Sequence, residues 1–252
     1  GAPTDVSAVS TGSQIMQTVT SLITGLAMGI TILVGQKIGE KRPEQAGDVI
    51  GSGICLFGVL AAVLTVLMIL GAGFLAGLMH APDEAFSQTV DYIRICSAGA
   101  VFIIAYNVLG SIFRGIGDSR MPLFTVAAAC VFNIGGDLLL VAGFHMGAAG
   151  AALATVAAQA AGVLLSLAVI RRRTLPFTIG KKNLRFERRL VGKILALGTP
   201  IALQDLLVSI SFLVILAIVN SMGVIASAGV GVAEKLCAFI MLVASAYMQS
   251  MS

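Results

Sequence analysis

Charged residues are scarce in this chain, since Asp, Glu, Lys and Arg make up 11% of its 252 residues. The mean hydropathy is +1.00. A soluble domain of this length would need far more polar surface to cover its core, so the composition excludes an ordinary soluble fold. None of the four cysteines forms a CxxC pair, which argues against zinc and dithiol redox sites.

Catalytic motifs are also missing. The chain contains neither HExxH nor GxSxG, the patterns of zinc proteases and serine hydrolases. His80 and His145 lack a second ligand at metal spacing. We therefore expect no enzyme activity, no metal site and no cofactor.

Long apolar stretches take the place of these features. Val49–Pro82, Leu138–Ile170 and Leu206–Ala233 contain no Asp, Glu, Lys or Arg, and a transmembrane helix needs roughly 20 mostly apolar residues. The chain is thus predicted to be an all-α polytopic membrane protein. We expect seven helices, at about 11–36, 49–78, 90–113, 121–143, 148–170, 194–219 and 225–250.

Basic residues cluster in alternate loops. Loops 37–48, 114–120 and 171–193 hold three, two and nine of the 16 Lys and Arg residues, whereas the loop at 80–91 holds none. The positive-inside rule places the three basic loops in the cytoplasm and the chain in the cytoplasmic membrane. This distribution accounts for the net charge of +4, so we expect the lipid bilayer as a partner and no nucleic acid.

The second basic loop carries the segment Arg-Gly-Ile-Gly-Asp-Ser-Arg-Met-Pro at 114–122. Its glycines permit a tight reversal, and Asp118 or Ser119 can cap the following helix. Arg114 and Arg120 are expected to contact anionic head groups. The segment fits a rigid hairpin turn, with a gating role as the alternative.

Ionisable groups inside a membrane are costly and are candidates for function. Asn133 and Asp137 are four residues apart and share a helix face. The outer turn between these two helices is centred near Met146. Counting residues from this turn places Asp137 and Thr155 at the same depth, roughly 13 Å below it, and places Asn133 and Gln159 together at a greater depth. A desolvated carboxylate takes up a proton or binds a cation. The alternative is a structural Asp that holds two helices together.

Three further ionisable groups lie in the last two segments. Asp205 is either a substrate contact or a helix-packing acid, and it lies roughly 18 Å into the membrane at 1.5 Å per residue. Glu234 and Lys235 are adjacent, so their side chains diverge by about 100°. They form either a structural ion pair, with Lys235 reaching toward Asp205, or part of a substrate site. The possible substrate cavity comprises Gln159, Asp205, Glu234 and Lys235.

Three segments together resemble the multidrug and toxic compound extrusion (MATE) transporters. The loop at 114–122 resembles that family's loop between helices four and five. Val-Gly-Gln-Lys-Ile-Gly at 34–39, with the following Glu-Lys-Arg-Pro-Glu-Gln-Ala, resembles the loop after helix two, and Gly-Thr-Pro-Ile-Ala-Leu-Gln at 198–204 resembles the start of helix seven. A faint repeat of Ser-Ala at 7–8 and 227–228 agrees with the family's two halves.

The resemblance implies a MATE-like two-lobe helical bundle. Residues 1–180 would form most of the N-terminal six-helix lobe without helix one, and residues 181–252 the first two helices of the C-terminal lobe. We thus expect an internal piece of a longer transporter, running from helix two into helix eight of twelve.

The resemblance also implies a function. In the DinF-like branch an Asn-x-x-x-Asp pair and a Thr belong to a cation-coupling site, and Asn133, Asp137 and Thr155 match them. We expect a monomeric antiporter that exports small organic cations by alternating access in exchange for H⁺ or Na⁺. The alternative is a flippase for lipid-linked precursors, which would line its cavity with Arg; in this chain Arg94 is the only Arg expected within a membrane segment.

Overall fold

The computed structural model describes residues 3–221 and 224–251, and every regular element in these ranges is a helix. The side chains of Glu234 and Lys235 lie outside the described part of the chain. The helices are α1 (Pro3–Gly39), α2 (Pro43–Leu78), α3 (Asp83–Ala98), α4 (Ala100–Ile116), α5 (Arg120–Asp137), the π-helix η1 (Leu138–Gly143), α6 (Gly147–Arg172), α7 (Arg188–Ser221) and α8 (Val224–Met251).

All seven predicted segments coincide with helical stretches, but several helices begin earlier than predicted. α1 begins at Pro3 rather than near residue 11, and α7 begins at Arg188 rather than near residue 194. The predicted segments end where charged residues begin, whereas the helices of the structure continue past the apolar region into polar surroundings. Helix formation requires backbone hydrogen bonds and does not stop where the side chains become charged.

The third predicted segment is a broken helix. α3 and α4 meet at Gly99 with a bend of 53°. A Cβ atom on Gly99 would lie 2.6 Å from Cγ2 of Val156, so only glycine lets α6 approach the chain here. Five helices are long and apolar enough to cross a membrane, and the bent pair supplies a sixth span within the described residues.

A helical irregularity also interrupts the fourth span. After Asp137 the backbone continues as η1, where the amide of Phe144 donates to the carbonyl of Leu139, five residues back, at 3.0 Å. Such π-turns hold more residues per turn than an α-helix and advance less along the axis per residue. The segment that follows Asp137 is thereby shortened.

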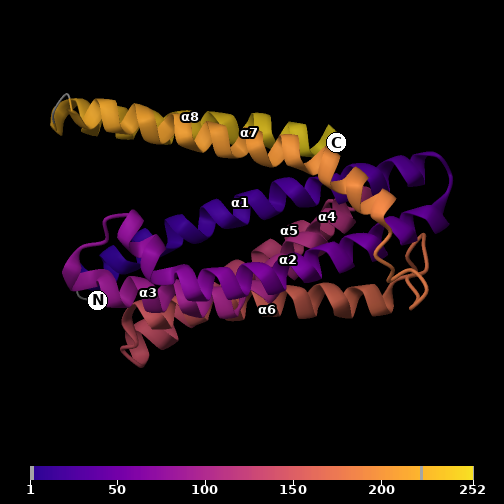
Figure 1. The fold of residues 1–252 in the computed structure, drawn as a ribbon, viewed down its shortest axis with the longest axis horizontal. Coiled ribbons are helices and arrows are strands. Elements are labelled where there is room, and N and C mark those ends of the chain that lie inside the picture. The colour runs from indigo at the N-terminus through magenta and orange to yellow at the C-terminus, as the bar shows by residue number, and fades with distance from the viewer. Residues whose placement is uncertain (1–2, 222–223, 252) are drawn as a thin grey trace.

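The helix α1 lies at the centre of the structure and packs against α2, α3, α4 and α7 (Figure 1). The main core cluster joins α1, α2, α4 and the first turns of α7, with Ile30, Ile50 and Ile194 fully buried. A second cluster lies nearer the other end and joins α1, α2, α3 and α6.

The helices α1 and α7 meet at one end and separate toward the other. A Cβ atom on Gly25 would lie 2.6 Å from Cα of Ala202, and Gly29 and Gly198 lie directly against the partner backbone. Beyond Ala202 the described side chains of α7 are exposed apart from the partly buried Leu206. Figure 1 shows α7 and α8 diverging from the other helices in this direction, which agrees with the exposure of these side chains.

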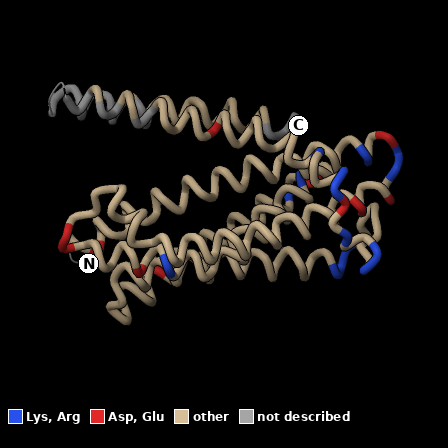
Figure 2. Tube along the Cα trace, viewed as in Figure 1, with Lys and Arg blue, Asp and Glu red and all other residues tan. Residues whose placement is uncertain are grey.

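Large apolar side chains cover the outside of the bundle. Leu70 and Phe74 of α2 are 79% and 74% exposed, and Leu123 and Phe124 of α5 are 69% and 67% exposed. Contiguous apolar surface of this kind does not persist in water. Figure 2 shows that Lys and Arg gather at the end where α7 begins, as the alternation of basic loops predicted.

The loop between α4 and α5 is the predicted tight reversal. Gly117 has a φ of +86°, which favours glycine. Oδ1 of Asp118 accepts hydrogen bonds from the amides of Arg120 and Met121 at 3.1 and 3.2 Å, so Asp118 rather than Ser119 caps α5. The prediction for Arg114 was wrong: it belongs to the last turn of α4, is half-buried, and donates from Nη2 to Oγ of Ser111 at 3.2 Å.

The segment 173–187 connects α6 to α7 and is fastened to α2. Oγ of Ser52 donates to the carbonyl of Arg185 at 2.9 Å, and Nδ2 of Asn183 donates to Oδ1 of Asp48 at 3.1 Å. Phe177 is buried in the core cluster that also contains Ile194. The predicted boundary between 180 and 181 falls in this segment, and the division into lobes stays a prediction.

Candidate functional site

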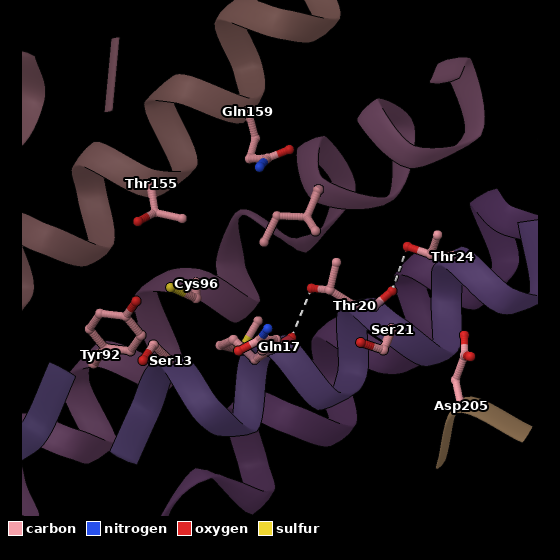
Figure 3. A pocket seen from close by; sticks show the side chains of 12 residues that line it. Ser13, Gln17, Thr20, Ser21, Thr24, Tyr92, Cys96, Thr155, Gln159 and Asp205 are labelled. Carbon is pink, nitrogen blue, oxygen red and sulfur yellow. Dashed lines mark hydrogen bonds between the residues drawn. The ribbon is translucent and has the colours of Figure 1, made fainter. Parts of the chain in front are cut away.

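A cavity of about 540 Å³ lies where α1, α3, α4, α6 and α7 come together (Figure 3). Most of its lining side chains are neutral and polar. The lining residues are Ser13, Met16, Gln17, Thr20, Ser21, Thr24, Tyr92, Cys96, Ile103, Thr155, Gln159 and Asp205. The cavity therefore contains three residues of the predicted site, namely Thr155, Gln159 and Asp205.

One wall of the cavity is a polar stripe on α1 that the sequence analysis missed. The stripe consists of Ser13, Gln17, Thr20, Ser21 and Thr24. Their spacing of four, three, one and three residues keeps them on one helical face. This spacing is present in the sequence, but neutral hydroxyl and amide groups cost less to bury than charges and therefore give a weaker signal of function.

Backbone hydrogen bonds hold part of this stripe. The hydroxyl of Thr20 donates to the carbonyl of Met16 at 2.8 Å. The hydroxyl of Thr24 lies 2.8 Å from the carbonyl oxygen of Thr20 and 2.9 Å from Oδ1 of Asn107 on α4. Hydroxyls that bond to carbonyls of their own helix satisfy their polar atoms in an apolar surrounding, as Thr20 and Thr24 do here.

The broken span forms the next wall. Tyr92 and Cys96 lie on α3 before the Gly99 break, and Ile103 lies on α4 after it. The phenol of Tyr92 interacts with the hydroxyl of Thr155 and the thiol of Cys96. The bend thus directs side chains from two helices toward the same space, as Figure 3 shows for Tyr92 and Cys96 of α3.

The structure brings Asn133 and Thr155 together. Nδ2 of Asn133 donates to Oγ1 of Thr155 at 3.3 Å, and Oγ1 of Thr155 donates to the carbonyl of Ala151 at 3.0 Å. The residue count predicts that Asn133 lies at the depth of Gln159. This prediction was wrong, since Asn133 lies at the depth of Thr155. Because η1 advances less per residue than an α-helix, Asn133 lies closer to the outer turn than the count predicted.

Asp137 is the last residue of α5, directly before the π-helix. Its Oδ1 atom is buried and accepts no hydrogen bond from the described residues, and the same holds for Oε1 of Gln159. Asp137 lies close enough to Tyr92 for their charges to interact. Neither Asn133 nor Asp137 is among the residues that line the cavity, and Asn133 is linked to it through its hydrogen bond to the lining residue Thr155.

Asp205 supplies the negative charge of the cavity. It is the only Asp, Glu, Lys or Arg among the lining residues of the described chain. It lies on α7 three residues beyond Ala202, close to the point where α1 and α7 separate. Figure 3 shows the Asp205 carboxylate near Thr24 and Ser21 of α1. The predicted contacts of Glu234 and Lys235 fall outside the described side chains.

The chemistry of the site is that of oxygen acceptors. The polar lining residues carry hydroxyl, amide and carboxylate oxygens, and these atoms bind protons and hard cations. Within the described residues no group of three His, Cys, Asp or Glu side chains is arranged to hold a metal ion.

Comparison with known proteins now decides the family. Residues 2–139, over half of the chain, match the profile of the family described as MatE. The chain belongs to the MatE family. This confirms the resemblance seen in the sequence, and MatE proteins are transporters and not enzymes.

Several curated proteins that this MatE chain resembles are named as probable multidrug resistance proteins or multidrug export proteins. The "Probable multidrug resistance protein YoeA" of Bacillus subtilis (strain 168) is 28% identical over 244 residues, which cover 94% of this chain and 53% of that protein. This chain spans about half the length of the curated relatives that it matches.

Two solved structures of a multidrug resistance MATE family transporter show the same fold. The one in an outward-facing conformation has a TM-score of 0.82 at 25% identity, covering 88% of this chain and 49% of that one. The one in an inward-facing conformation has a TM-score of 0.77 at 26% identity, covering 81% and 47%. The all-helical membrane fold of this MatE chain is thereby confirmed.

Proposed function

We propose that this MatE chain forms part of a transporter in the cytoplasmic membrane that exports small organic cations in exchange for H⁺ or Na⁺. The observation that carries the proposal is the lining of the cavity, which contains Asp205 as its one charged residue within the described chain. A cavity with a single carboxylate attracts cations, and no Lys or Arg among the lining residues offsets it. Neutral oxygens around it supply hydrogen-bond acceptors for a protonated amine.

The coupling ion would act at Asp137. Its buried Oδ1 accepts no hydrogen bond from the described residues, and a carboxylate oxygen left so in an apolar medium is costly. A proton or a Na⁺ would remove that cost by neutralising the charge. Asn133, one turn from Asp137 on the same helix face, bonds to the lining residue Thr155, so ion uptake at Asp137 could alter the cavity wall through this pair.

Alternating access requires the cavity to open to each side in turn. The contact of Gly25 and Gly29 with α7 closes the end that carries the basic loops, and α7 diverges from the other helices toward the opposite end. With the basic loops in the cytoplasm this arrangement faces outward, in keeping with the TM-scores for the two solved conformations. Export would end in this state, where the entering cation displaces the substrate.

The proposal is tested by transport in proteoliposomes. The full-length protein is reconstituted, a Na⁺ or pH gradient is imposed, and the movement of a fluorescent organic cation is followed. We expect the organic cation to leave the vesicles only when the coupling ion is more concentrated outside, so that inward flow of the ion drives its export. Asp205→Asn should weaken transport of the cation, whereas Asp83→Asn, which removes an exposed carboxylate at the start of α3, should leave it unchanged.

The same vesicles distinguish an exporter of organic cations from the second candidate function, a flippase for lipid-linked precursors. Arg94 of α3 is exposed and is not among the residues lining the cavity, which disfavours a polyanionic substrate. If no organic cation moves under either gradient but a fluorescent lipid-linked phosphate changes leaflet, the exporter proposal is wrong.

A further inference from the structure

A second cavity, of about 400 Å³, lies at the end of the bundle where the basic loops gather. It is separate from the first cavity, with which it shares no lining residue. Its walls come from the end of α1, the start of α2 and the first turns of α7. The lining residues are Lys37, Arg42, Gln45, Asp48, Glu187, Arg189, Leu190 and Lys193.

Cationic side chains outnumber acidic ones around this space. Four Lys and Arg residues face two carboxylates. Lys37 is paired with Glu40 at 3.0 Å, but Arg42, Arg189 and Lys193 form no ion pair with a described residue. Cations that converge on a cavity repel one another, so an anion placed between them would be stabilised.

The two lining carboxylates and Glu40 offset only part of this charge, since Glu40 pairs with Lys37 and lies within electrostatic reach of Arg42 and Lys193. Oδ1 of Asp48 accepts a hydrogen bond from Nδ2 of Asn183, which holds it toward the connecting segment. Glu187 precedes α7, and its amide donates to the carbonyl of Arg185 at 3.0 Å. Neither carboxylate forms an ion pair with a lining cation in the described chain.

The position of the cavity identifies the class of anion. It lies where the apolar stretches of three helices give way to charged residues, which is the level of the lipid head groups. Basic pockets between membrane helices at this level hold lipid phosphates, and guanidinium groups bind phosphate oxygens in a bidentate manner. Arg42 and Arg189 supply two such groups from different elements, Arg42 from the residue before α2 and Arg189 from α7.

We propose that this cavity binds a phosphate group, carried either by an anionic lipid or by a free phosphate, between Arg42 on one side and Arg189 and Lys193 on the other. Arg42 precedes α2, whereas Arg189 and Lys193 belong to α7. The bound anion would therefore link α7 to the α1–α2 hairpin at the end where Gly29 contacts Ile194. Its binding would stabilise the closed basic end of the protein.

The test is the thermal unfolding midpoint of the purified full-length protein in micelles. It is measured with phosphatidylcholine alone, with added phosphatidylglycerol, and with inorganic phosphate alone. We expect the anionic ligand that binds to raise the midpoint by about 2–4 °C in the wild type. Arg189→Gln/Lys193→Gln should abolish this rise. Lys181→Gln/Lys182→Gln removes the same charge from exposed positions outside the cavity and should retain it.

The outcomes show whether the bound phosphate belongs to a lipid or is free, and two of them would overturn the proposal. A rise with phosphatidylglycerol alone assigns the site to a lipid head group, and an equal rise with inorganic phosphate assigns it to the phosphate itself. An equal rise in the cavity variant and the control would show general charge attraction and overturn the site, as would no rise with either ligand. If the double variant does not fold, Arg42→Gln and native mass spectrometry of retained lipid give the same comparison.

Discussion

Oγ1 of Thr155 accepts a hydrogen bond from Nδ2 of Asn133 while donating its own proton to the carbonyl of Ala151. The hydroxyl is therefore oriented by both α5 and α6, and the amide of Asn133 faces α6. Asp137, one turn along the same helix face, is left with a buried oxygen that accepts no hydrogen bond from the described residues. Asn133 and Thr155 thus hydrogen-bond to each other, whereas the neighbouring Asp137 carboxylate has an oxygen without such a bond. The first prediction rests on this difference.

Replacing Thr155 with Val should impair ion coupling. Val keeps the shape but removes both hydrogen bonds, which leaves the amide of Asn133 unpaired at a cost of about 1–3 kcal/mol. We expect a weaker response of efflux to the ion gradient, measured as the ion concentration for half-maximal transport. Thr155→Ser keeps the hydroxyl and should behave like the wild type, and similar values for Val and Ser would contradict the role of this bond.

A larger side chain at Gly25 should open the basic end of the protein. A Cβ atom there meets Cα of Ala202 at 2.6 Å, and overpacking of this kind costs about 1–3 kcal/mol. We expect Gly25→Val to lengthen the distance between spin labels at Glu44 and Arg188, two exposed positions in the first turns of α2 and α7. Gly58→Val is the control, since no heavy atom lies within 4 Å of its Cβ position. An unchanged distance in Gly25→Val would show that this contact does not close the end.

Asp118 should contribute to stability through its cap of α5. Asp118→Ala removes the acceptor for two amides and an exposed ion pair with Arg173 at 2.8 Å. Loss of a cap costs about 0.5–2 kcal/mol, whereas an exposed ion pair adds little. We expect a lower unfolding midpoint for Asp118→Ala and no change for Ser119→Ala, since the side chain of Ser119 makes no capping hydrogen bond. Equal effects of the two variants would contradict this assignment.

The sequence predicted the helices and their order because long apolar runs and charged loops are strong signals. Two features that shape the site could not be predicted from the sequence. Gly99 is one of 29 glycines, and its break depends on contact with Val156 in another helix. The π-helix after Asp137 follows from packing and has no sequence pattern of its own, so the register of Asn133 was predicted wrongly.

The candidate site was predicted in part for a related reason. Charged residues within apolar runs stand out, so Asp137 and Asp205 were found from the sequence. The α1 stripe of neutral residues, from Ser13 to Thr24, did not stand out, although its spacing is helical. Arg114 was placed in a loop because its charge was taken to mark a helix end, and the structure places it in α4, bonded to Ser111.

The central claim is that Asp137 couples cation entry to export, and its most direct measurement compares Asp137→Asn with the wild type. Efflux of a fluorescent organic cation is followed while a Na⁺ or pH gradient is imposed, with protein level held equal. Asp91→Asn on α3 is the control, because it removes an exposed carboxylate outside the cavity. The account predicts that the wild type and the control follow one gradient and that Asp137→Asn does not respond to it. Gradient-driven efflux that is unchanged in Asp137→Asn would contradict it.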